Sequence, residues 1–431
     1  MGKRYQVSKP DIARRVALGL ISEVIKNGKL LSELTLEPNF IFLTPSQRAR
    51  AQRLATETLR ALERVDRVLG KYLNKNPPFK VKNILRLATF ELCAGGQAHG
   101  VVNDAVSLVA SEKKLNDFKG LVNAVLRKVS TAGPEQWILM RPARVPTWLR
   151  KPLKKVYGSH VMNAIEKVQS YIPPTDLTLK NPSQAEAYAN FLGGEVVLGQ
   201  SVRLHKAGQI SKLKGYHIGD WWVQDAAAAI PVRLLGELDR VLALDLCAAP
   251  GGKTLQLAAS GAQVKAVDVS SNRVRRLEAN LNRTGLWADV LVMDARDVRE
   301  KSFDVIVLDA PCSATGTLRR HPDLPFAKNG SDFNRLFNLQ GQMLEHAINL
   351  LKPRGRLVYC TCSLLPDEGE VQVEKLLSKR SDVNIDSSMF EHSFLDDSWL
   401  EDPLGIRLRP DYLSDHGGMD GFFISLLRKK A

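Results

Sequence analysis

The chain has 431 residues, of which 44% are hydrophobic and 25% charged, so two or three domains with ample material for apolar cores are expected. It contains no uncharged apolar run of about 20 residues, which excludes a membrane-spanning helix, and its first residues lack the apolar core of a signal peptide. A soluble cytoplasmic protein is therefore expected, and its five cysteines are too few for a disulfide framework and are expected to be free thiols.

The positive charge is concentrated in the N-terminal part of the chain. Residues 1–160 contain 29 Lys and Arg against 12 Asp and Glu, a net charge of +17, whereas the remaining residues sum to −2. A strongly basic module joined to a nearly neutral one indicates a polyanionic partner. This distribution favours a nucleic acid over a merely solvated lysine-rich surface.

Residues 10–130 carry apolar side chains at helical spacing, and no alternating strand pattern interrupts them. They predict a compact all-α domain, which we assign to residues 1–140. Pro134, Pro142 and Pro146 mark a connector over residues 131–150, and an irregular mixed segment follows. Residues 141–225 are therefore assigned to a connector and a small mixed subdomain.

The pattern changes after residue 240, where five short runs rich in Val, Leu and Ile are mostly separated by helical stretches. This alternation predicts a parallel sheet with helices on both faces, assigned to residues 226–431. Ligands of such sheets bind at the carboxyl ends of the strands. The five runs are RVLALDLC, AQVKAVDVS, ADVLVMDA, FDVIVLDAP and GRLVYCTCS.

The loop DLCAAPGGKT (245–254) is similar to a phosphate-binding P-loop but departs from its pattern. Cys247 stands where a P-loop has its first glycine, and Pro250 removes one backbone N–H donor. A nucleotide triphosphatase, with VIVLDAP (305–311) as its second motif, is the less favoured alternative. The favoured interpretation is a nucleoside-binding loop, in which Gly251 and Gly252 let the backbone approach a ligand closely.

Four of the predicted strands end in an aspartate. At these positions Asp268 is suited to accept hydrogen bonds from ribose hydroxyls, and Asp294 is placed to meet an adenine. One aspartate at a strand end is weak support, but four in register beside a glycine loop indicate a nucleoside ligand. S-adenosylmethionine has a ribose, an adenine and no phosphate, so it suits this loop. The four residues are Asp245, Asp268, Asp294 and Asp309.

Two thiol motifs follow strands of the same predicted sheet. Cys312 comes after the fourth run, and Cys360 and Cys362 lie at the end of the fifth. A thiolate beside S-adenosylmethionine suggests methylation of a pyrimidine, whose carbon 5 becomes reactive when a thiolate adds to carbon 6. A free cysteine is more often a small buried apolar residue, and this interpretation is preferred for Cys93 and Cys360. The Cys-x-Cys pair lacks further zinc ligands, so no metal site is expected.

The motifs DLCAAPGGKT, DAPCSATGTLRRHPD and TCSLLPDEGE closely resemble those of the bacterial RsmB family, also called Fmu or Sun. Members of that family are S-adenosylmethionine-dependent ribosomal RNA cytosine-5 methyltransferases. The segments VVNDAVSLVASE and GLVNAVLRKVS resemble the NusB-like helical RNA-binding domain of the same family. The resemblance implies an α/β Rossmann-like methyltransferase domain preceded by an all-α NusB-like RNA-binding domain.

The resemblance also implies roles for single residues. Cys362 matches the nucleophile, Cys312 matches the cysteine assigned to resolving the covalent product, and Asp309 is suited to hydrogen-bond the cytosine edge. DNA cytosine methyltransferases attack with the cysteine of their Pro-Cys motif, so Cys312 remains the alternative nucleophile. The residues implied for the cofactor are Cys247, Ala248, Ala249, Pro250, Gly251, Gly252, Lys253, Asp268, Asp294 and Asp309.

The implied substrate is 16S ribosomal RNA with an unpaired or flipped cytosine, because a stacked base cannot be reached from both ring faces. The stretch LRRHP (318–322) is interpreted as a basic loop that contacts the phosphates around that base. No obligate protein partner is expected. Two alternatives stay open: a non-catalytic RNA-binding ribosome assembly factor, and a methyltransferase that acts on another RNA.

Overall fold

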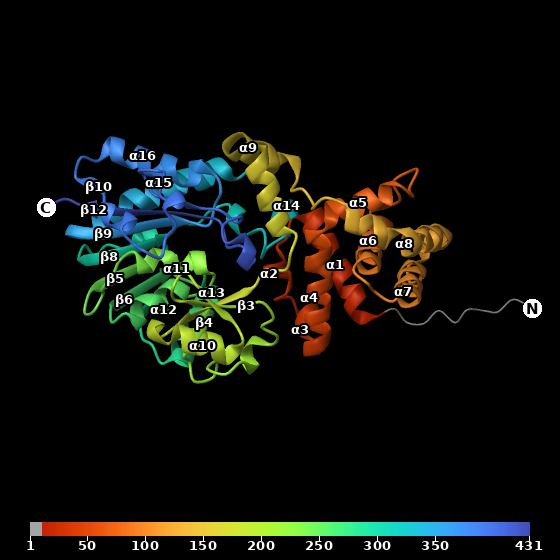
Figure 1. Ribbon diagram of the computed structural model, residues 1–431, viewed down its shortest axis with the longest axis horizontal. Helices are drawn as coiled ribbons and strands as arrows, with labels where there is room; N and C mark the ends of the chain where they lie inside the picture. The colour runs from red at the N-terminus through yellow and green to blue at the C-terminus, as the bar shows by residue number, and fades with distance from the viewer. Residues whose placement is uncertain (1–10) are drawn as a thin grey trace, which may run out of the picture. The chain divides into compact units, whose positions relative to one another are not determined.

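The computed structural model describes residues 11–431, and the expectation about a signal peptide rests largely on residues that lie outside this range. The described chain forms two compact units (Figure 1). The helical unit consists of the chain up to Ser170 together with Leu318–Gly330, and the α/β unit consists of Tyr171–Thr317 and Ser331–Ala431. No helix within residues 11–431 is long and apolar enough to cross a bilayer.

The helical unit confirms the predicted all-α domain. Its first helix begins after Asp11, whose carboxylate accepts a hydrogen bond from the backbone N–H of Arg14. The same helix ends at Gly28, which adopts the left-handed conformation with a φ of 67°. The helices of this unit are α1 (Ile12–Asn27), α2 (Leu31–Leu34), α3 (Pro38–Ile41), α4 (Pro45–Arg60), α5 (Leu62–Gly70), α6 (Phe79–Cys93), α7 (Ala98–Ala110), α8 (Lys119–Leu139), α9 (Thr147–Gln169) and α14 (Leu324–Ala327).

The connector between helices is shorter than the sequence predicts. Helix α8 continues through Pro134 to Leu139, so only residues 140–146 separate it from α9. Proline lacks a backbone N–H and usually ends a helix. Here Arg64 of α5 lies 4.0 Å from the ring centre of Trp137 and donates a hydrogen bond to its carbonyl, and this tertiary contact supports the last turns of α8.

A short segment from the second half of the sequence, residues 318–330, completes the helical unit. The backbone N–H of Leu31 donates to the Asp323 carboxylate at 2.8 Å, and Arg60 donates to the carbonyl of Arg319 at 2.6 Å. The side chain of Arg319 is fully buried. The interpretation of LRRHP as a phosphate-contacting loop is therefore wrong for Arg319, because a buried guanidinium cannot reach RNA.

The α/β unit is built on a sheet with the strand order β10-β12-β9-β8-β5-β6-β7, in which β11 pairs with β12 off this path. Strands β9, β8, β5, β6 and β7 are parallel, as the sequence predicts, but β12 runs antiparallel between β9 and β10. The sheet is mixed because β12 follows β11 without a crossover helix and so returns in the opposite direction. The strands are β5 (Leu242–Leu246), β6 (Gln263–Asp268), β7 (Asp289–Val292), β8 (Phe303–Asp309), β9 (Leu351–Thr361), β10 (Val383–Ile385), β11 (Ile406–Leu408) and β12 (Phe422–Lys429).

Helices cover both faces of this sheet (Figure 1). Helices α11 (Ala226–Arg233), α12 (Gly252–Ala259) and α13 (Ser271–Thr284) pack on one face, and α15 (Phe333–Leu350) and α16 (Glu370–Lys379) pack on the other. Strand β8 shows the reason, because its side chains alternate between the two cores and are apolar on both sides. Val305 and Val307 belong to the first core, and Ile306 and Leu308 belong to the second.

The irregular middle segment forms a small antiparallel sheet in the order β2-β3-β1-β4. A fully buried ion pair joins Arg203 to Asp176 through two contacts of 2.7 Å. Arg203 also donates to the carbonyls of His416 and Gly418, which precede β12, so it fastens the small sheet to the main one. The elements are β1 (Thr175–Leu179), α10 (Ala185–Leu192), β2 (Glu195–Val197), β3 (Ser201–Leu204) and β4 (Trp221–Val223).

Candidate active site

The two cysteines that the sequence singles out lie next to each other in the structure. Cys312 follows β8, Cys362 follows β9, and their sulfur atoms are 3.4 Å apart. These strands are parallel neighbours, so their carboxyl ends bring the two loops together. The hydrogen bond with Cys362, followed by burial, raises the pKa of the Cys312 thiol well above its usual range. The pair therefore favours a protonated Cys312 beside Cys362.

A buried carboxylate that sequence reasoning missed ties the loop of Cys312 to the end of β9. Glu368 is completely buried and accepts hydrogen bonds from both the backbone N–H and the hydroxyl of Ser313. Gln340 of α15 donates to the same carboxylate at 3.0 Å. Tyr359 and Thr361 donate their hydroxyls to the Glu368 carbonyl at 2.8 and 3.0 Å. Glu368 stands among several acidic residues of the run PDEGE, and the sequence carries no signal that this one is buried.

Asp309 lies at the carboxyl end of β8 between a lysine and a third thiol. Its carboxylate receives the Lys253 ammonium at 2.7 Å, and the Cys360 sulfur is 3.7 Å from its other oxygen. Burial is the largest single effect and opposes the charge of Lys253, but the surrounding acidic groups, Asp309 first among them, together raise the pKa of Lys253. Cys360 is fully buried, as expected of a small core residue, and burial raises the pKa of its thiol well above the usual range.

The loop that follows β5 has an unusual backbone. Cys247 adopts a positive φ of 65°, and Gly251 has a φ of 112°. A side chain on Gly251 would come within 2.5 Å of Leu277 on α13, so this glycine permits close packing of the loop on the helix. The structure thus adds a reason for Gly251 besides the predicted approach to a ligand.

Asp268 and Asp294 occupy the two strand ends beyond this loop. Asp268 is buried and accepts hydrogen bonds from the backbone N–H groups of Ala249 and Ser270, so it joins β6 directly to the loop. Asp294, two residues after β7, is paired with Arg296 instead, and this hydrogen bond lowers the pKa of its carboxyl to about 2. The structure brings Asp268 to the loop and leaves Asp294 at its own strand end.

Asp245 of β5 is buried beneath the loop. Thr254 donates its hydroxyl to one carboxylate oxygen at 2.6 Å, and the other oxygen has no hydrogen-bond partner among the described residues. Burial raises the pKa of Asp245 to about 7. This carboxyl is a buried polar group that can still accept a hydrogen bond.

These residues fit a nucleoside ligand better than a triphosphate. In a P-loop the lysine is available to phosphate, whereas Lys253 is buried and already paired with Asp309. Pro250 withholds one backbone donor from any phosphate. Carboxylates at the ends of β6 and β8 instead suit the hydroxyl and amino donors of an adenosyl group.

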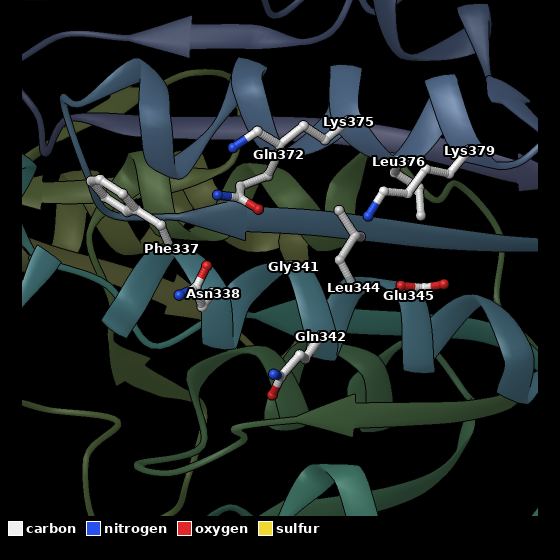
Figure 2. Close-up of a pocket in the computed structure, with 10 residues that line it drawn as sticks. All are labelled: Phe337, Asn338, Gly341, Gln342, Leu344, Glu345, Gln372, Lys375, Leu376 and Lys379. Carbon is white, nitrogen blue, oxygen red and sulfur yellow. The ribbon is translucent and has the colours of Figure 1, made fainter. Parts of the chain in front are cut away.

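A separate cavity of about 300 Å³ lies between α15 and α16, on one face of the sheet (Figure 2). Figure 2 shows Gln372 of α16 and Phe337 of α15 among the side chains that line it. None of the site residues that the sequence predicts lines this cavity. It lies on a helix-covered face rather than at the strand ends, so we do not assign the active site to it.

Two family models match the chain in the order of its two parts. The NusB family model matches residues 11–131, and a model described as 16S rRNA methyltransferase RsmB/F matches residues 233–428. The chain is 31% identical over 446 aligned positions to Ribosomal RNA small subunit methyltransferase B of Pasteurella multocida, with 96% of both chains covered. It is 32% identical over 403 positions to the protein of the same name from Cronobacter sakazakii, covering 87% of this chain and 92% of that one.

Solved structures share the fold. The crystal structure of PH0851 matches 98% of this chain and 99% of its own, with a TM-score of 0.72 and 22% identity. NSun6 from Pyrococcus horikoshii with SFG matches 66% of this chain and 98% of its own, with a TM-score of 0.57 and 21% identity.

The resemblance drawn from the sequence motifs is thus confirmed over nearly the whole chain. The cofactor is S-adenosylmethionine, which agrees with a loop that lacks a phosphate cradle. The chain belongs to the RsmB/F family of 16S ribosomal RNA methyltransferases.

Proposed function

We propose that this protein methylates carbon 5 of a specific cytosine in 16S ribosomal RNA, with Cys362 as the nucleophile. The observation that carries the proposal is the 3.4 Å separation of the Cys312 and Cys362 sulfurs at the carboxyl ends of β8 and β9. Two thiols at the strand-end edge of a sheet that also carries the cofactor loop supply the groups that such a reaction needs.

Cys362 provides the covalent step. Its thiolate adds to carbon 6 of the cytosine, the carbon–sulfur bond forms, and the ring electrons move toward carbon 5. S-adenosylmethionine supplies an electrophilic methyl group when it is bound. The carbon 5 proton then passes to a nearby base, the electrons of the carbon–hydrogen bond re-form the ring double bond, and the carbon–sulfur bond breaks to regenerate the Cys362 thiolate.

Cys312 is assigned to release of the product. Its raised pKa keeps a thiol proton on Cys312, beside the Cys362 sulfur. Its position in hydrogen-bond contact with Cys362 supports a role in which the Cys312 thiol donates a hydrogen bond to the Cys362 thiolate as that thiolate leaves carbon 6.

Asp309 is proposed to orient the base. Its side chain keeps about a third of its surface exposed, with 34% relative accessibility, although one oxygen is held by Lys253. A carboxylate in this position can accept a hydrogen bond from the exocyclic amine of cytosine. The cytosine must be unpaired or flipped, since Cys362 and the methyl donor require access to the ring.

The cofactor is proposed to lie against residues 247–253, with Asp268 toward the ribose and Asp294 toward the adenine. Asp268 supports this placement because it already binds the backbone of the loop at Ala249. Asp294 lies one strand farther along the same edge.

The boundaries 1–140, 141–225 and 226–431 remain our proposal for the functional division of the chain.

The proposal is tested by incubating the protein with labelled S-adenosylmethionine and unmethylated small-subunit RNA. The expected result is label in RNA, located at carbon 5 of one cytosine by mass spectrometry of the digested nucleosides. Tight RNA binding without transfer would favour a non-catalytic assembly factor. Transfer to a different RNA or a different atom would contradict the proposed substrate.

A further inference from the structure

The helical unit contains a cavity of about 640 Å³ that includes none of the proposed active-site residues. It is formed by α5, α6, the connector after α8, the first turns of α9 and Phe326 from the segment 318–330. Part of its wall is apolar, with Leu62, Val145 and Phe326 among the lining residues. The remainder of the wall is strongly charged.

Three arginines of the wall are already neutralised by ion pairs. The Arg86 guanidinium binds both carboxylate oxygens of Asp66, at 2.7 and 2.6 Å. Glu63 receives Arg141 at 2.7 Å. These pairs occupy both carboxylates that line the cavity, so neither is free to repel an anionic ligand.

The third paired arginine belongs to α9. Arg150 binds the nearly buried carboxylate of Glu166 at 2.8 Å, across the break that Gly158 makes within α9. This pair fixes the first turns of α9, which carry the remaining lysines of the wall.

Three further cations line the cavity, and their own side chains make no hydrogen bond or ion pair with any residue between 11 and 431. They are Arg144, Lys151 and Lys154, and all three are exposed. Lys151 and Lys154 are three residues apart on α9, so they lie on one face of that helix. The cavity therefore combines an apolar wall with three uncompensated positive charges.

This combination matches one ligand class. A nucleotide of RNA offers a phosphodiester to cations and a flat base or sugar to an apolar wall. The surrounding unit favours a polyanion, because the chain up to Ser170 together with Leu318–Gly330 has 33 Lys and Arg against 14 Asp and Glu, a net charge of +19. The rest of the chain has 28 against 32, a net charge of −4.

We propose that this cavity is a second RNA-binding site, in which Arg144, Lys151 and Lys154 bind the phosphodiester backbone of the substrate. The choice of RNA as ligand rests on the proposed function. All three cations lie between residue 131 and residue 233, in the stretch that neither family model matches. The three cations therefore lie outside both matched regions, whereas other residues of the wall, such as Leu62 and Phe326, lie inside them.

The test measures RNA binding by the full-length protein without S-adenosylmethionine, by fluorescence anisotropy over a series of KCl concentrations. The variant is the triple substitution Arg144→Ala, Lys151→Ala, Lys154→Ala, and the probe is a labelled fragment of unmethylated small-subunit RNA. The matched control is Lys113→Ala, Lys114→Ala, Lys128→Ala, which removes the same charge from exposed lysines of the same unit. Thermal unfolding confirms that both variants fold.

Each lost phosphate contact lowers the slope of log affinity against log salt by about 0.7 for a single strand. In the cavity variant the slope is expected to decrease by about 2, since three contacts are lost. Its RNA affinity at moderate salt is expected to fall at least about tenfold. In the control, the slope of log affinity against log salt is expected to decrease by less than about 0.7, the contribution of a single phosphate contact. Equal losses in both variants, or an unchanged slope in the cavity variant, would overturn the proposal.

The outcome is independent of the methyl-transfer reaction. A protein that binds RNA through this cavity but transfers no methyl group would contradict the proposed function and leave this site standing. If the protein methylates RNA but the cavity variant binds RNA as the control does, the proposed function stands and the second RNA-binding site is contradicted.

Discussion

At the level of single residues, the buried carboxyl of Asp245 links the chemistry of the cofactor loop to the stability of the sheet. Its folded-state pKa of about 7 lies above the unfolded value of about 3.9. Burial therefore stabilises the protonated form. Its contribution to stability is complete below pH 4 or so and is lost as the pH rises through about 7.

Asp245→Asn removes this titration while keeping a polar group of the same shape. As the pH rises from 5 to 8, the original protein loses the contribution of protonated Asp245 and the variant does not. We therefore expect the unfolding free energy of the variant, minus that of the original protein, to increase with pH over this range. Urea denaturation at several pH values measures the difference. Asp239→Asn, at a side chain that is 79% exposed, is the control and should show no such trend. A pH-independent difference for Asp245→Asn would contradict the assignment.

The apolar strand patterns locate Cys312, Cys362 and Asp309, and the structure places all three at the carboxyl ends of β8 and β9. The sequence does not predict their hydrogen-bond partners. Glu368 and Ser313 are ordinary polar residues in the sequence, and only the parallel pairing of β8 with β9 makes them neighbours. Whether a given carboxylate is buried depends on tertiary packing rather than on local pattern.

At the level of elements, Glu368 connects the Cys312 loop to the end of β9. Glu368→Ala removes the carboxylate that accepts hydrogen bonds from the backbone N–H and the hydroxyl of Ser313. Loss of a hydrogen bond to a charged group costs about 1.5–3 kcal/mol, and the loop is expected to shift. We expect methyl transfer to fall at least about tenfold, while RNA affinity stays within about twofold, because misplacement of catalytic groups by about 1 Å has large effects.

The matched control is the neighbouring Asp367→Ala, whose side chain is exposed. Single-turnover methyl transfer and equilibrium RNA binding are measured on both variants. Comparable rates for the two variants would show that Glu368 does not position the cysteine loop.

The segment 318–330 is a second element whose role depends on one contact. The Asp323 carboxylate accepts the backbone N–H of Leu31 in a buried position. Asp323→Ala is expected to destabilise the helical unit by about 1–3 kcal/mol because that N–H loses its acceptor. Chemical denaturation of the full chain measures the loss, and Asp117→Ala at an exposed position of the same unit is the control. If Asp323→Ala leaves the unfolding transition unchanged, the hydrogen bond from Leu31 to Asp323 does not stabilise the helical unit.

The elements also show where sequence patterns fail. Runs of Val, Leu and Ile locate β5, β6, β7, β8 and β9 within a few residues. Strands β5 and β8 are mostly buried on both sides, whereas Leu291 and Val292 of the outer strand β7 are exposed. The antiparallel direction of β12 and the placement of residues 318–330 in the helical unit are not encoded in periodicity. Both depend on contacts between segments far apart in the chain.

At the level of the whole molecule, the net positive charge belongs to the helical unit, at +19, whereas the rest of the chain has a net charge of −4. RNA binding should therefore depend strongly on salt, whereas binding of S-adenosylmethionine at the α/β unit should not. We expect RNA affinity to fall at least about tenfold between 50 and 200 mM salt, as in complexes with several phosphate contacts. Anisotropy for RNA and calorimetry for the cofactor measure the two dependences, and equal dependences would contradict this division of roles.

The central claim, that Cys362 bonds covalently to the cytosine ring, is tested most directly by trapping the adduct. Cys312→Ala protein is incubated with S-adenosylmethionine and unmethylated small-subunit RNA, digested with nuclease and protease, and analysed by mass spectrometry. The account predicts a methylated cytosine nucleotide attached to the peptide that contains Cys362. Wild-type rates of methylation by a Cys362→Ala variant, or a nucleotide attached to Cys312 in that variant, would contradict it.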